Sequence, residues 1–549
     1  MLRRRLVEVS VLLAIMAPRT LAGQDTTGAL IRAHVAAARV PGARWPDFPR
    51  YVDDVARFYA SHGDAPVWLD GEQVSRAGRA VVAELLGAAS HGLDPRDYDA
   101  ATLDSLARQL ADSAAGVDRA RLDLMLSVDL IRYLDDLHRG RAFPQPAGRP
   151  APAADEPVDW AAAVSRALEA DSIALLVAAA APRLAQYANL RRLLARYRAL
   201  AADSSIVPLP EELALQPGDT SAVLPALRRR LVALGDLPAD TAAGAPPDRY
   251  AGAVVEAVRG FQTRHGLTPD GIIGPATLVQ LNTPLARRVR QIELALERLR
   301  WLPPIGQQRF LVVNIPAFQL YAFDSVGGTG APSLSMKAVV GKALDTRTPV
   351  LFEQMRYVEF QPYWNVPRSI LVSEILPILR RDDAYLRTHH MEVVGARDRV
   401  IGDDPTPDVL ARLARGELRV RQRPGTWNAL GLVKFVFPNA ASVYMHGTPD
   451  TELFEHTRRD FSHGCIRLED PEALAAWVLR DQPEWTGERV QEAMAGPATT
   501  RALLTRPLPV IVFYTTAVAT PAGSALFLPD IYGHDADLDE VLRAGPTLP

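Results

Sequence analysis

The periodicity of apolar residues changes once along the chain, near residue 309, and this change limits the fold more than any other feature. Upstream, apolar residues recur at steps of three and four, which is typical of amphipathic helices. Downstream, short apolar runs such as residues 310–315 and 319–323 are typical of strands. Because the helical and β-type segments are separate, and 549 residues suffice for about three domains, we predict a multidomain α+β protein.

The first long segment, residues 40–210, is predicted to form a helical scaffold domain. Its clearest helix carries five apolar residues on one face: Leu124, Val128, Ile131, Leu134 and Leu137. A second helix is predicted over residues 190–200, and the Pro- and Ala-rich residues 143–157 predict a linker. The three histidines of this segment are isolated from other reactive side chains, so structural roles are favoured for His62, His91 and His138.

Residues 218–285 are predicted to form a second, smaller unit of three short helices. The first begins near Leu224, and the second lies over residues 254–261. Pro275 directly follows Gly274 and is predicted at the first position of the third helix, where its missing N–H costs nothing. The pattern predicts a compact three-helix domain.

The remainder of the chain is predicted to be β-rich. The strand-type runs extend over residues 305–525, and helix-like segments interrupt them over residues 368–430. Insertions of that kind often act as lids over active sites. The last residues, 526–549, are predicted to be a C-terminal tail.

The N-terminus has the pattern of an export signal. Arginines at positions 3–5 precede a short apolar run, residues 9–17, and Thr20 and Ala22 provide small residues before a cleavage point. We therefore predict a signal peptide over residues 1–22 and export to the periplasm. The run is far shorter than the roughly 20 residues that span a bilayer, so no permanent membrane span is expected.

The charge distribution argues against a nucleic-acid partner. The formal net charge is −3 and no long run has a single sign. A nucleic-acid-binding surface would usually show as a basic stripe.

The single cysteine, Cys465, lies in the stretch that carries the most chemical information. A cysteine nucleophile needs an imidazole to take its proton and N–H donors aimed at the oxyanion. His446 ends a predicted strand upstream, and His463 lies two residues before the cysteine. Gly464 allows a tight turn in which N–H groups could converge. Strand alternation places Tyr444 on the same face as His446.

The residues by themselves leave three interpretations open. The first is a Cys–His site for acyl transfer, and the second is a zinc site that uses His446, His463 and Cys465. A fourth zinc ligand is not evident nearby, although His456 or Asp460 could be suggested. The third interpretation is that these side chains only pack.

The same stretch resembles a known family. The letters H-G-T-P at 446–449 and F-S-H-G-C-I-R-L at 461–468 are similar to the signature of the cysteine L,D-transpeptidases. Similarity to the large, multidomain periplasmic branch of that family extends over six further stretches, at 58–63, 91–95, 136–141, 360–370, 421–439 and 530–533. Residues 218–285 resemble the peptidoglycan-binding domain-1 family. The resemblance covers nearly the whole chain after residue 22 and implies a scaffold, a peptidoglycan-binding domain and a catalytic domain with a lid-like insertion.

The resemblance also implies roles for individual residues. Cys465 would be the nucleophile and His446 its base, with the carbonyl of Gly447 orienting the histidine ring. His463 and Gly464 would shape the loop, and N–H groups around Gly464 and Cys465 would form the oxyanion hole. Four further residues are expected to contact substrate or support the loop: Arg467, Tyr444, Trp364 and Ser462. Trp427 is a weaker candidate, for a lid contact.

The implied reaction joins two peptide stems of peptidoglycan. Cys465 would attack a tetrapeptide donor, D-alanine would leave, and the side-chain amine of a diamino acid in another stem would attack the thioester, giving a 3→3 cross-link. Water, a D-amino acid or a lipoprotein lysine as acceptor would give carboxypeptidase, exchange or anchoring at the same site. A non-catalytic wall-binding scaffold is the competing class. No cofactor or metal is implied, and carbapenems are expected to acylate the same cysteine.

Overall fold

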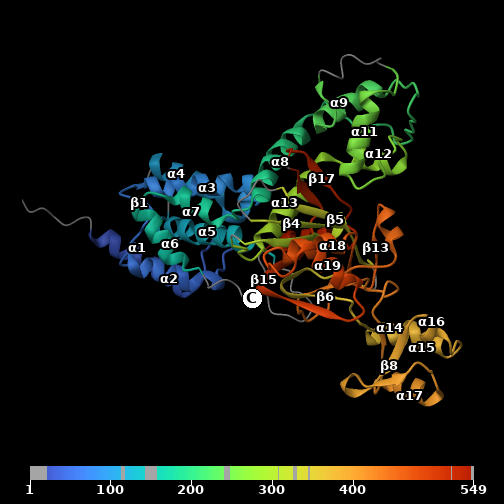
Figure 1. The fold of residues 1–549 in the computed structure, drawn as a ribbon. Coiled ribbons are helices and arrows are strands. Elements are labelled where there is room, and N and C mark those ends of the chain that lie inside the picture. Colours follow the sequence, from blue (N-terminus) through green and yellow to red (C-terminus); the bar gives the residue numbers. More distant parts are fainter. Residues whose placement is uncertain are drawn as a thin grey trace, which may run out of the picture.

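The computed structural model describes residues 21–112, 118–142, 158–239, 248–306, 308–325, 331–343, 346–520 and 522–545, with side chains from Thr26 onward. Figure 1 shows a central β-rich body, a helical scaffold on one side, a small helical unit above and an insertion that projects below. The predicted fold class is confirmed, because the chain is multidomain, with a helical scaffold, a small helical unit and a β-rich domain that carries an insertion.

Two predictions fall largely outside the described residues. The predicted signal peptide occupies residues 1–22, of which 1–20 are not described, and the predicted linker over 143–157 is not described at all. No single described helix is long and apolar enough to cross a membrane. Only α7 (Ile173–Ala180) and α8 (Ala185–Ala202) taken together pass that test of length and composition, and they are bent by 109° at their junction.

Helices build the scaffold around one apolar core. Its regular elements are α1 (Leu21–Ala36), α2 (Val52–Ser61), β1 (Leu69–Asp70), β2 (Gln73–Val74), α3 (Arg76–Leu86), α4 (Ala100–Asp112), α5 (Arg119–Arg139), α6 (Trp160–Glu169) and α7 (Ile173–Ala180), with 3-10 turns η1 (Pro49–Tyr51), η2 (Gly87–His91) and η3 (Pro95–Tyr98). The five apolar residues predicted to share a helix face lie in α5 and are all buried. Asp118 caps this helix, since its carboxylate accepts from the Arg121 N–H at 3.0 Å.

Two long helices connect the scaffold to the rest of the molecule. The helices α8 (Ala185–Ala202) and α13 (Leu285–Arg300) pack against each other, and an ion pair of 2.8 Å joins Arg198 to Glu293. Their apolar faces belong to a core shared with the small helical unit rather than to the scaffold core. The helix predicted over 190–200 is therefore a connector between units.

The small unit contains α9 (Leu224–Leu234), α11 (Ala253–Arg264) and α12 (Pro275–Asn282). Pro275 is the first residue of α12 and Gly274 its cap, as the sequence predicts. The unit is fixed to the hairpin of β16 (Ala517–Ala519) and β17 (Ala525–Phe527), because Arg264 donates to the Ala525 carbonyl at 2.8 Å.

A nine-stranded mixed sheet forms the β-rich domain, in the order β13-β5-β14-β12-β11-β6-β15-β3-β4. Its strands are β3 (Phe310–Asn314), β4 (Gln319–Phe323), β5 (Leu334–Gly341), β6 (Leu351–Phe360), β11 (Val433–Val436), β12 (Met445–His446), β13 (Asp460–Ser462), β14 (Ile466–Leu468) and β15 (Thr500–Phe513). Because β4 also pairs with β5, the sheet closes on itself like a barrel. The helices α18 (Pro471–Leu479) and α19 (Gly487–Ala495) pack on it and share its apolar core.

The insertion interrupts two neighbouring antiparallel strands, β6 and β11, and has a core of its own. Its four-stranded sheet has the order β7-β10-β8-β9, formed by β7 (Trp364–Asn365), β8 (Met391–Val394), β9 (Val400–Gly402) and β10 (Arg419–Gln422). Its helical elements are α14 (Arg368–Ile370), the π-type turn η5 (Leu371–Ile375), α15 (Leu376–Leu379), α16 (Tyr385–Thr388), the 3-10 turn η6 (Ala396–Asp398) and α17 (Pro407–Arg415). The start of the insertion, where helix-like segments are predicted, is divided between α14, η5 and α15.

The expected C-terminal tail is folded over most of its length. After β17, the chain forms α20 (His534–Ala544), which packs along α13. Two interactions explain this: Arg298 donates to the buried Asp535 at 2.5 Å, and Leu538 packs against Leu294 and Trp301. This helix was not predicted from the sequence, because it covers only a small apolar patch.

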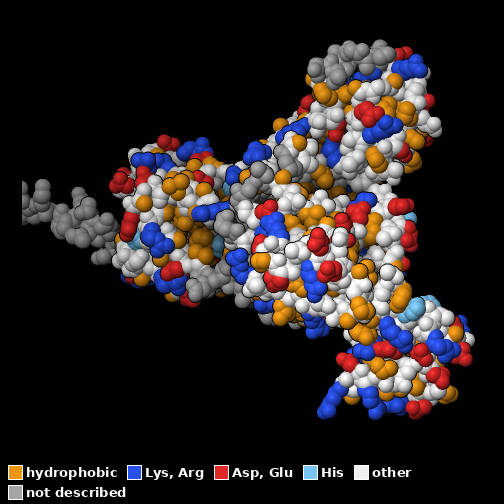
Figure 2. Space-filling view, viewed as in Figure 1, with side chains coloured by type: hydrophobic (Ala, Val, Ile, Leu, Met, Phe, Trp, Pro, Cys, Tyr) orange, Lys and Arg blue, Asp and Glu red, His pale blue; other side chains and the backbone are white. Residues whose placement is uncertain are grey.

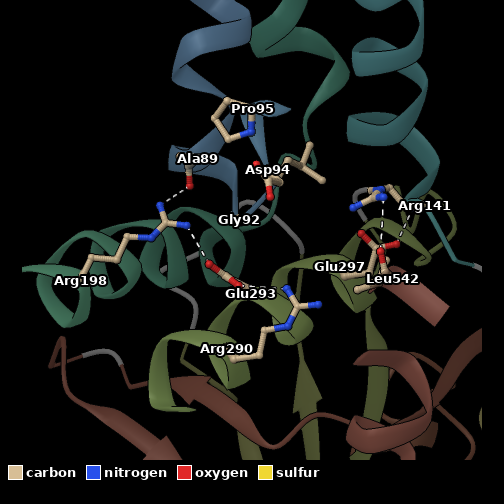
Figure 3. Close-up of a pocket in the computed structure, with 11 residues that line it drawn as sticks. Ala89, Gly92, Asp94, Pro95, Arg141, Arg198, Arg290, Glu293, Glu297 and Leu542 are labelled. Carbon is tan, nitrogen blue, oxygen red and sulfur yellow. Dashed lines mark hydrogen bonds and ion pairs between the residues drawn. The ribbon is translucent and has the colours of Figure 1, made fainter. Parts of the chain in front are cut away.

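A cavity of about 230 Å³ lies where the scaffold meets α13 and α20 (Figure 3). Its charged groups are paired with opposite charges: Arg198 and Arg290 both pair with Glu293. Arg141 pairs with Asp97, and Glu297 pairs with Arg300. None of the residues predicted for catalysis lines it. We interpret the cavity as part of the junction between units.

The visible surface carries no large area of one charge. Figure 2 shows Lys and Arg side chains interspersed with Asp and Glu over all the units in view. This matches the small net charge of the sequence.

Candidate active site

Cys465 lies in the short turn between β13 and β14. The strand β14 pairs in parallel with β12, with Ile466 opposite Met445 and Arg467 opposite His446. The Ile466 N–H also donates to the Tyr444 carbonyl at 3.1 Å. The pairing therefore brings the cysteine turn alongside the segment that carries Tyr444 and His446.

The His446 ring is buried and held in one orientation. Its Nδ1 donates to the Gly447 carbonyl at 2.5 Å, which leaves Nε2 as the acceptor of the neutral ring. Burial lowers the pKa of His446 to about 3, with the positive charge of Arg467 as the second cause. The imidazole is therefore neutral near pH 7 and able to take a proton.

The Cys465 thiol is partly exposed, and its surroundings act on its ionisation in opposite directions. Burial raises the pKa of the thiol, whereas hydrogen bonds from Tyr444 and the positive charges of Lys434 and Arg467 lower it. Tyr444 is joined to the residue after the cysteine through the Ile466 N–H, and its ring centroid lies 5.6 Å from that of His446. The resting thiol is protonated, so attack on a carbonyl requires a base.

A set of hydroxyl groups fixes the shape of the cysteine turn. Ser462 accepts the Gly464 N–H at 3.1 Å and donates to the Cys465 carbonyl at 2.5 Å. Thr348 donates to the Gly464 carbonyl at 2.9 Å, and Tyr532, just before α20, anchors the Thr348 backbone at 3.2 Å. The two hydrogen bonds of Ser462 therefore hold the backbone of the turn in place. Gly464 has a φ of +108°, which favours glycine at this position.

Gly431, in the segment before β11, also lies where only glycine fits. It has a φ of +61°, and a Cβ there would lie 2.7 Å from the Thr448 nitrogen and 2.8 Å from the Gly447 carbonyl carbon. Only glycine lets the turn after β12 come this close to the segment before β11. Gly431 thereby helps to fix the carbonyl that orients His446.

We expect Gly431→Ala to lower both stability and activity. The left-handed backbone alone costs about 1–2 kcal/mol for alanine, and the clash displaces Gly447. Thermal unfolding and carbapenem acylation measure the two effects. Gly487→Ala is the matched control, because no atom lies within 4 Å of its Cβ. Equal behaviour of the two variants would contradict the steric argument.

His463 contacts the insertion rather than His446. Its Nε2 lies 2.7 Å from Glu374 in η5, and both side chains are largely exposed. The cysteine turn and the insertion are thus joined by a polar contact two residues from Cys465. His463 is a connector in this structure.

Removing that contact is expected to loosen the insertion without unfolding the protein. An exposed pair of this kind contributes roughly 0.2–1 kcal/mol, so Glu374→Gln leaves the unfolding temperature nearly unchanged. Hydrogen–deuterium exchange is expected to quicken in η5 and in the turn around His463. Glu417→Gln is the control, since Glu417 pairs with Arg415 inside the insertion. The same exchange in both variants would show that the contact does not hold the insertion.

Of the remaining predicted residues, Arg467 lies near Cys465, whereas Trp364 and Trp427 contact the insertion. Arg467 forms an ion pair of 2.7 Å with Asp450 and adds positive charge near the thiol. Trp364 lies in β7 and packs against the insertion core, so it belongs to the insertion and not to the sheet that carries Cys465. Trp427 stacks on His390 of the insertion at 4.0 Å between ring centroids.

Sequence reasoning missed three residues that shape the site: Lys434, Glu374 and Thr348. Lys434 stands directly opposite His446 in the β11–β12 pair, and strand alternation from the predicted strand could have found it. Glu374 and Thr348 come from segments far from the cysteine in sequence, so spacing alone gave no signal.

The zinc interpretation requires His446, His463 and Cys465 to converge on one point. Among the described residues, no group of three or more His, Cys, Asp or Glu side chains is placed to hold a metal ion. His446 faces Gly447, and His463 faces Glu374. The geometry favours the Cys–His arrangement.

Three family profiles match successive parts of the chain. They are a scaffold domain over residues 53–194, a "Putative peptidoglycan binding domain" over 221–281 and an L,D-transpeptidase catalytic domain over 308–503. The last range contains every predicted site residue. The matches follow the order of the three structural units.

Individual proteins match over shorter spans. A "Putative L,D-transpeptidase" of Haemophilus influenzae is 31% identical over 250 residues, which are 46% of this chain and 49% of that protein. The chain thus spans about half the length of this relative. The crystal structure of an L,D-transpeptidase, residues 123–326, from Xylanimonas cellulosilytica covers 56% of this chain and all of that one, with 17% identity and a TM-score of 0.17, which is too low to support an argument.

Proposed function

With residues 308–503 forming an L,D-transpeptidase catalytic domain beside a peptidoglycan-binding domain, we propose that the protein forms 3→3 cross-links in peptidoglycan through a Cys465 thioester. The observation that carries this proposal is the pairing of β12 with β14. This pairing supports the proposal because it brings the turn that carries Cys465 alongside the strand that carries His446, whose buried, neutral imidazole is oriented by Gly447.

In the first half-reaction, Cys465 attacks the donor carbonyl that precedes the terminal D-alanine. The thiol turns from Tyr444 towards His446, whose Nε2 takes the proton as the C–S bond forms. The oxyanion accepts a hydrogen bond from the Cys465 N–H, because the Gly464 N–H is already bound to Ser462. The C–N bond then breaks, and the leaving amine takes the proton from His446.

The second half-reaction reverses these roles. The amine of an acceptor stem attacks the thioester, gives its proton to His446, and forms the new amide as the thiol leaves and is reprotonated. The imidazole is a weak base in the resting site, but the thiolate that forms beside it raises its basicity, because the two become an ion pair. No cofactor enters either step.

The proposal includes the setting of the reaction. The predicted signal over residues 1–22 would direct the protein to the periplasm, where tetrapeptide donors and diamino-acid acceptors occur. We propose the predicted bounds 40–210, 218–285 and 305–525 for the domains, the last with its insertion. Arg467 and Tyr444 are proposed to contact the donor, and Trp364 would approach it only through movement of the insertion.

Product analysis tests the reaction class. Residues 24–549 are incubated with disaccharide-tetrapeptides, and the products are identified by mass spectrometry. We expect a dimer that lacks one D-alanine. Loss of D-alanine without a dimer would indicate an L,D-carboxypeptidase, and incorporation of an added D-amino acid would indicate exchange. No turnover together with no carbapenem acylation would indicate a non-catalytic wall-binding protein.

A further inference from the structure

A row of charged side chains crosses the sheet towards Cys465. Lys434 of β11 stands opposite His446 of β12 on one side and Glu359 of β6 on the other. Glu359 in turn stands opposite Arg501 of β15. Directly paired residues project from the same face, so all four side chains share the face that carries the His446 ring.

Within this row, the Lys434 side chain extends over the ring of Tyr444, near Cys465. Arg501 donates to the buried Glu359 at 2.5 Å, which satisfies that carboxylate. The Lys434 ammonium instead lies 4.0 Å from the centre of the Tyr444 ring. No described carboxylate lies within ion-pair distance of it. A partly buried ammonium without an ion-pair partner is costly, so its position calls for a compensating interaction.

The side chain beneath the ammonium supplies that interaction. Tyr444 offers its ring face to the cation, and its backbone carbonyl accepts from the Ile466 N–H next to Cys465. Hydrogen bonding with Tyr444 also lowers the pKa of the Cys465 thiol, against the effect of burial. A negative charge on that sulfur would therefore face Lys434 across Tyr444. Burial lowers the pKa of Lys434, and the charges of Glu359 and, to a smaller extent, Cys465 act to raise it.

The choice of lysine at this position is unusual for this chain. Of 61 Lys and Arg residues, only those at 337, 342 and 434 are lysine. A Lys ammonium is a compact point charge on a flexible stem. The position thus combines a rare residue type with a defined contact.

We propose that Lys434 is a positioning residue of the reaction: held over Tyr444, its ammonium stabilises the thiolate of Cys465 and so makes the nucleophile easier to form. The inference rests on the proposed function, in which that thiolate attacks the donor. Arg467, from β14, contributes a second positive charge from the opposite side, although Asp450 partly neutralises it. His446 remains the group that accepts the proton.

Alkylation of the thiol tests this role without any peptide substrate. Because Cys465 is the only cysteine, the rate of iodoacetamide labelling against pH reports its ionisation alone. We expect Lys434→Met to move the midpoint of this profile upward by about one pH unit, which is about a tenfold slower rate below the midpoint. Lys434→Arg is expected to keep the midpoint close to that of the unchanged protein.

The control is Lys337→Met, which removes the same charge from an exposed pair with Glu469. A folded Lys434→Met protein with an unchanged midpoint would overturn the inference. If that variant does not fold, Lys434→Gln is measured and interpreted in the same way. A raised midpoint without cross-linking by the unchanged protein would refute the proposed reaction but not the role of Lys434.

Discussion

Replacing Cys465 by alanine is expected to abolish cross-link formation, lowering the rate by at least about 10⁴-fold. The thiol is the only group proposed to bond to the donor, and neither His446 nor Tyr444 can replace it. Mass spectrometry of the products measures the loss. Dimers formed by the alanine variant at a comparable rate would place the chemistry elsewhere.

The variant is expected to remain folded, so its inactivity can be assigned to chemistry. Alanine keeps the Cβ and the backbone, whose hydrogen bond to Ser462 holds the turn. Cys465→Ala should therefore unfold within a few degrees of the unchanged protein and retain binding to isolated peptidoglycan. Those two measurements form its control.

Replacing His446 by glutamine is the second large expected effect. We expect acylation near pH 7 to slow by about 10²–10⁴-fold, because the reaction loses its general base. Glutamine is close in size and can still donate to the Gly447 carbonyl, so the turn should keep its shape. Carbapenem acylation followed by intact mass provides the rate.

The pH profiles of the two proteins should differ in form. Burial lowers the pKa of His446 to about 3, so the ring stays neutral as pH falls through 6.5, and the rate of the unchanged protein should be nearly constant between pH 5 and 8. The variant depends on thiolate alone, so its rate should rise about tenfold per pH unit. A decline of the unchanged protein below pH 6.5 would contradict the buried-base assignment.

These assays are best done above pH 5, because protonation of His446 in the unfolded chain lowers the folding stability at lower pH. The folded protein holds His446 neutral while the unfolded chain protonates it below 6.5. The unfolded state therefore binds more protons between pH 6.5 and 3, and this group lowers folding stability progressively across that window.

The sequence pattern predicted those elements that are stabilised by interactions between residues close together in the chain. The face of α5 and the Gly274–Pro275 start of α12 follow from periodicity and capping, which act within a few residues. Cys465 and His446 could be identified for a similar reason, because their spacing reflects one strand and one adjacent turn.

Features made by distant segments could not be predicted in this way. The helix α20 is held by Arg298 and Asp535, which are far apart in sequence. The strand predicted over 442–446 is shortened to β12 because Asn439 bonds to the Val443 backbone and holds a turn, with Ser442 at a positive φ of 56°. The contact between His463 and Glu374 likewise exists only after the insertion has folded.

Mass spectrometry of the protein during turnover tests directly whether Cys465 carries the acyl group of the donor. The protein is mixed with a disaccharide-tetrapeptide donor, quenched in acid within seconds and digested. We expect the Cys465 peptide to carry the donor minus D-alanine. Hydroxylamine should remove this acyl group, as expected for a thioester. Turnover without any adduct on Cys465, or with an adduct on another residue, would contradict the central claim.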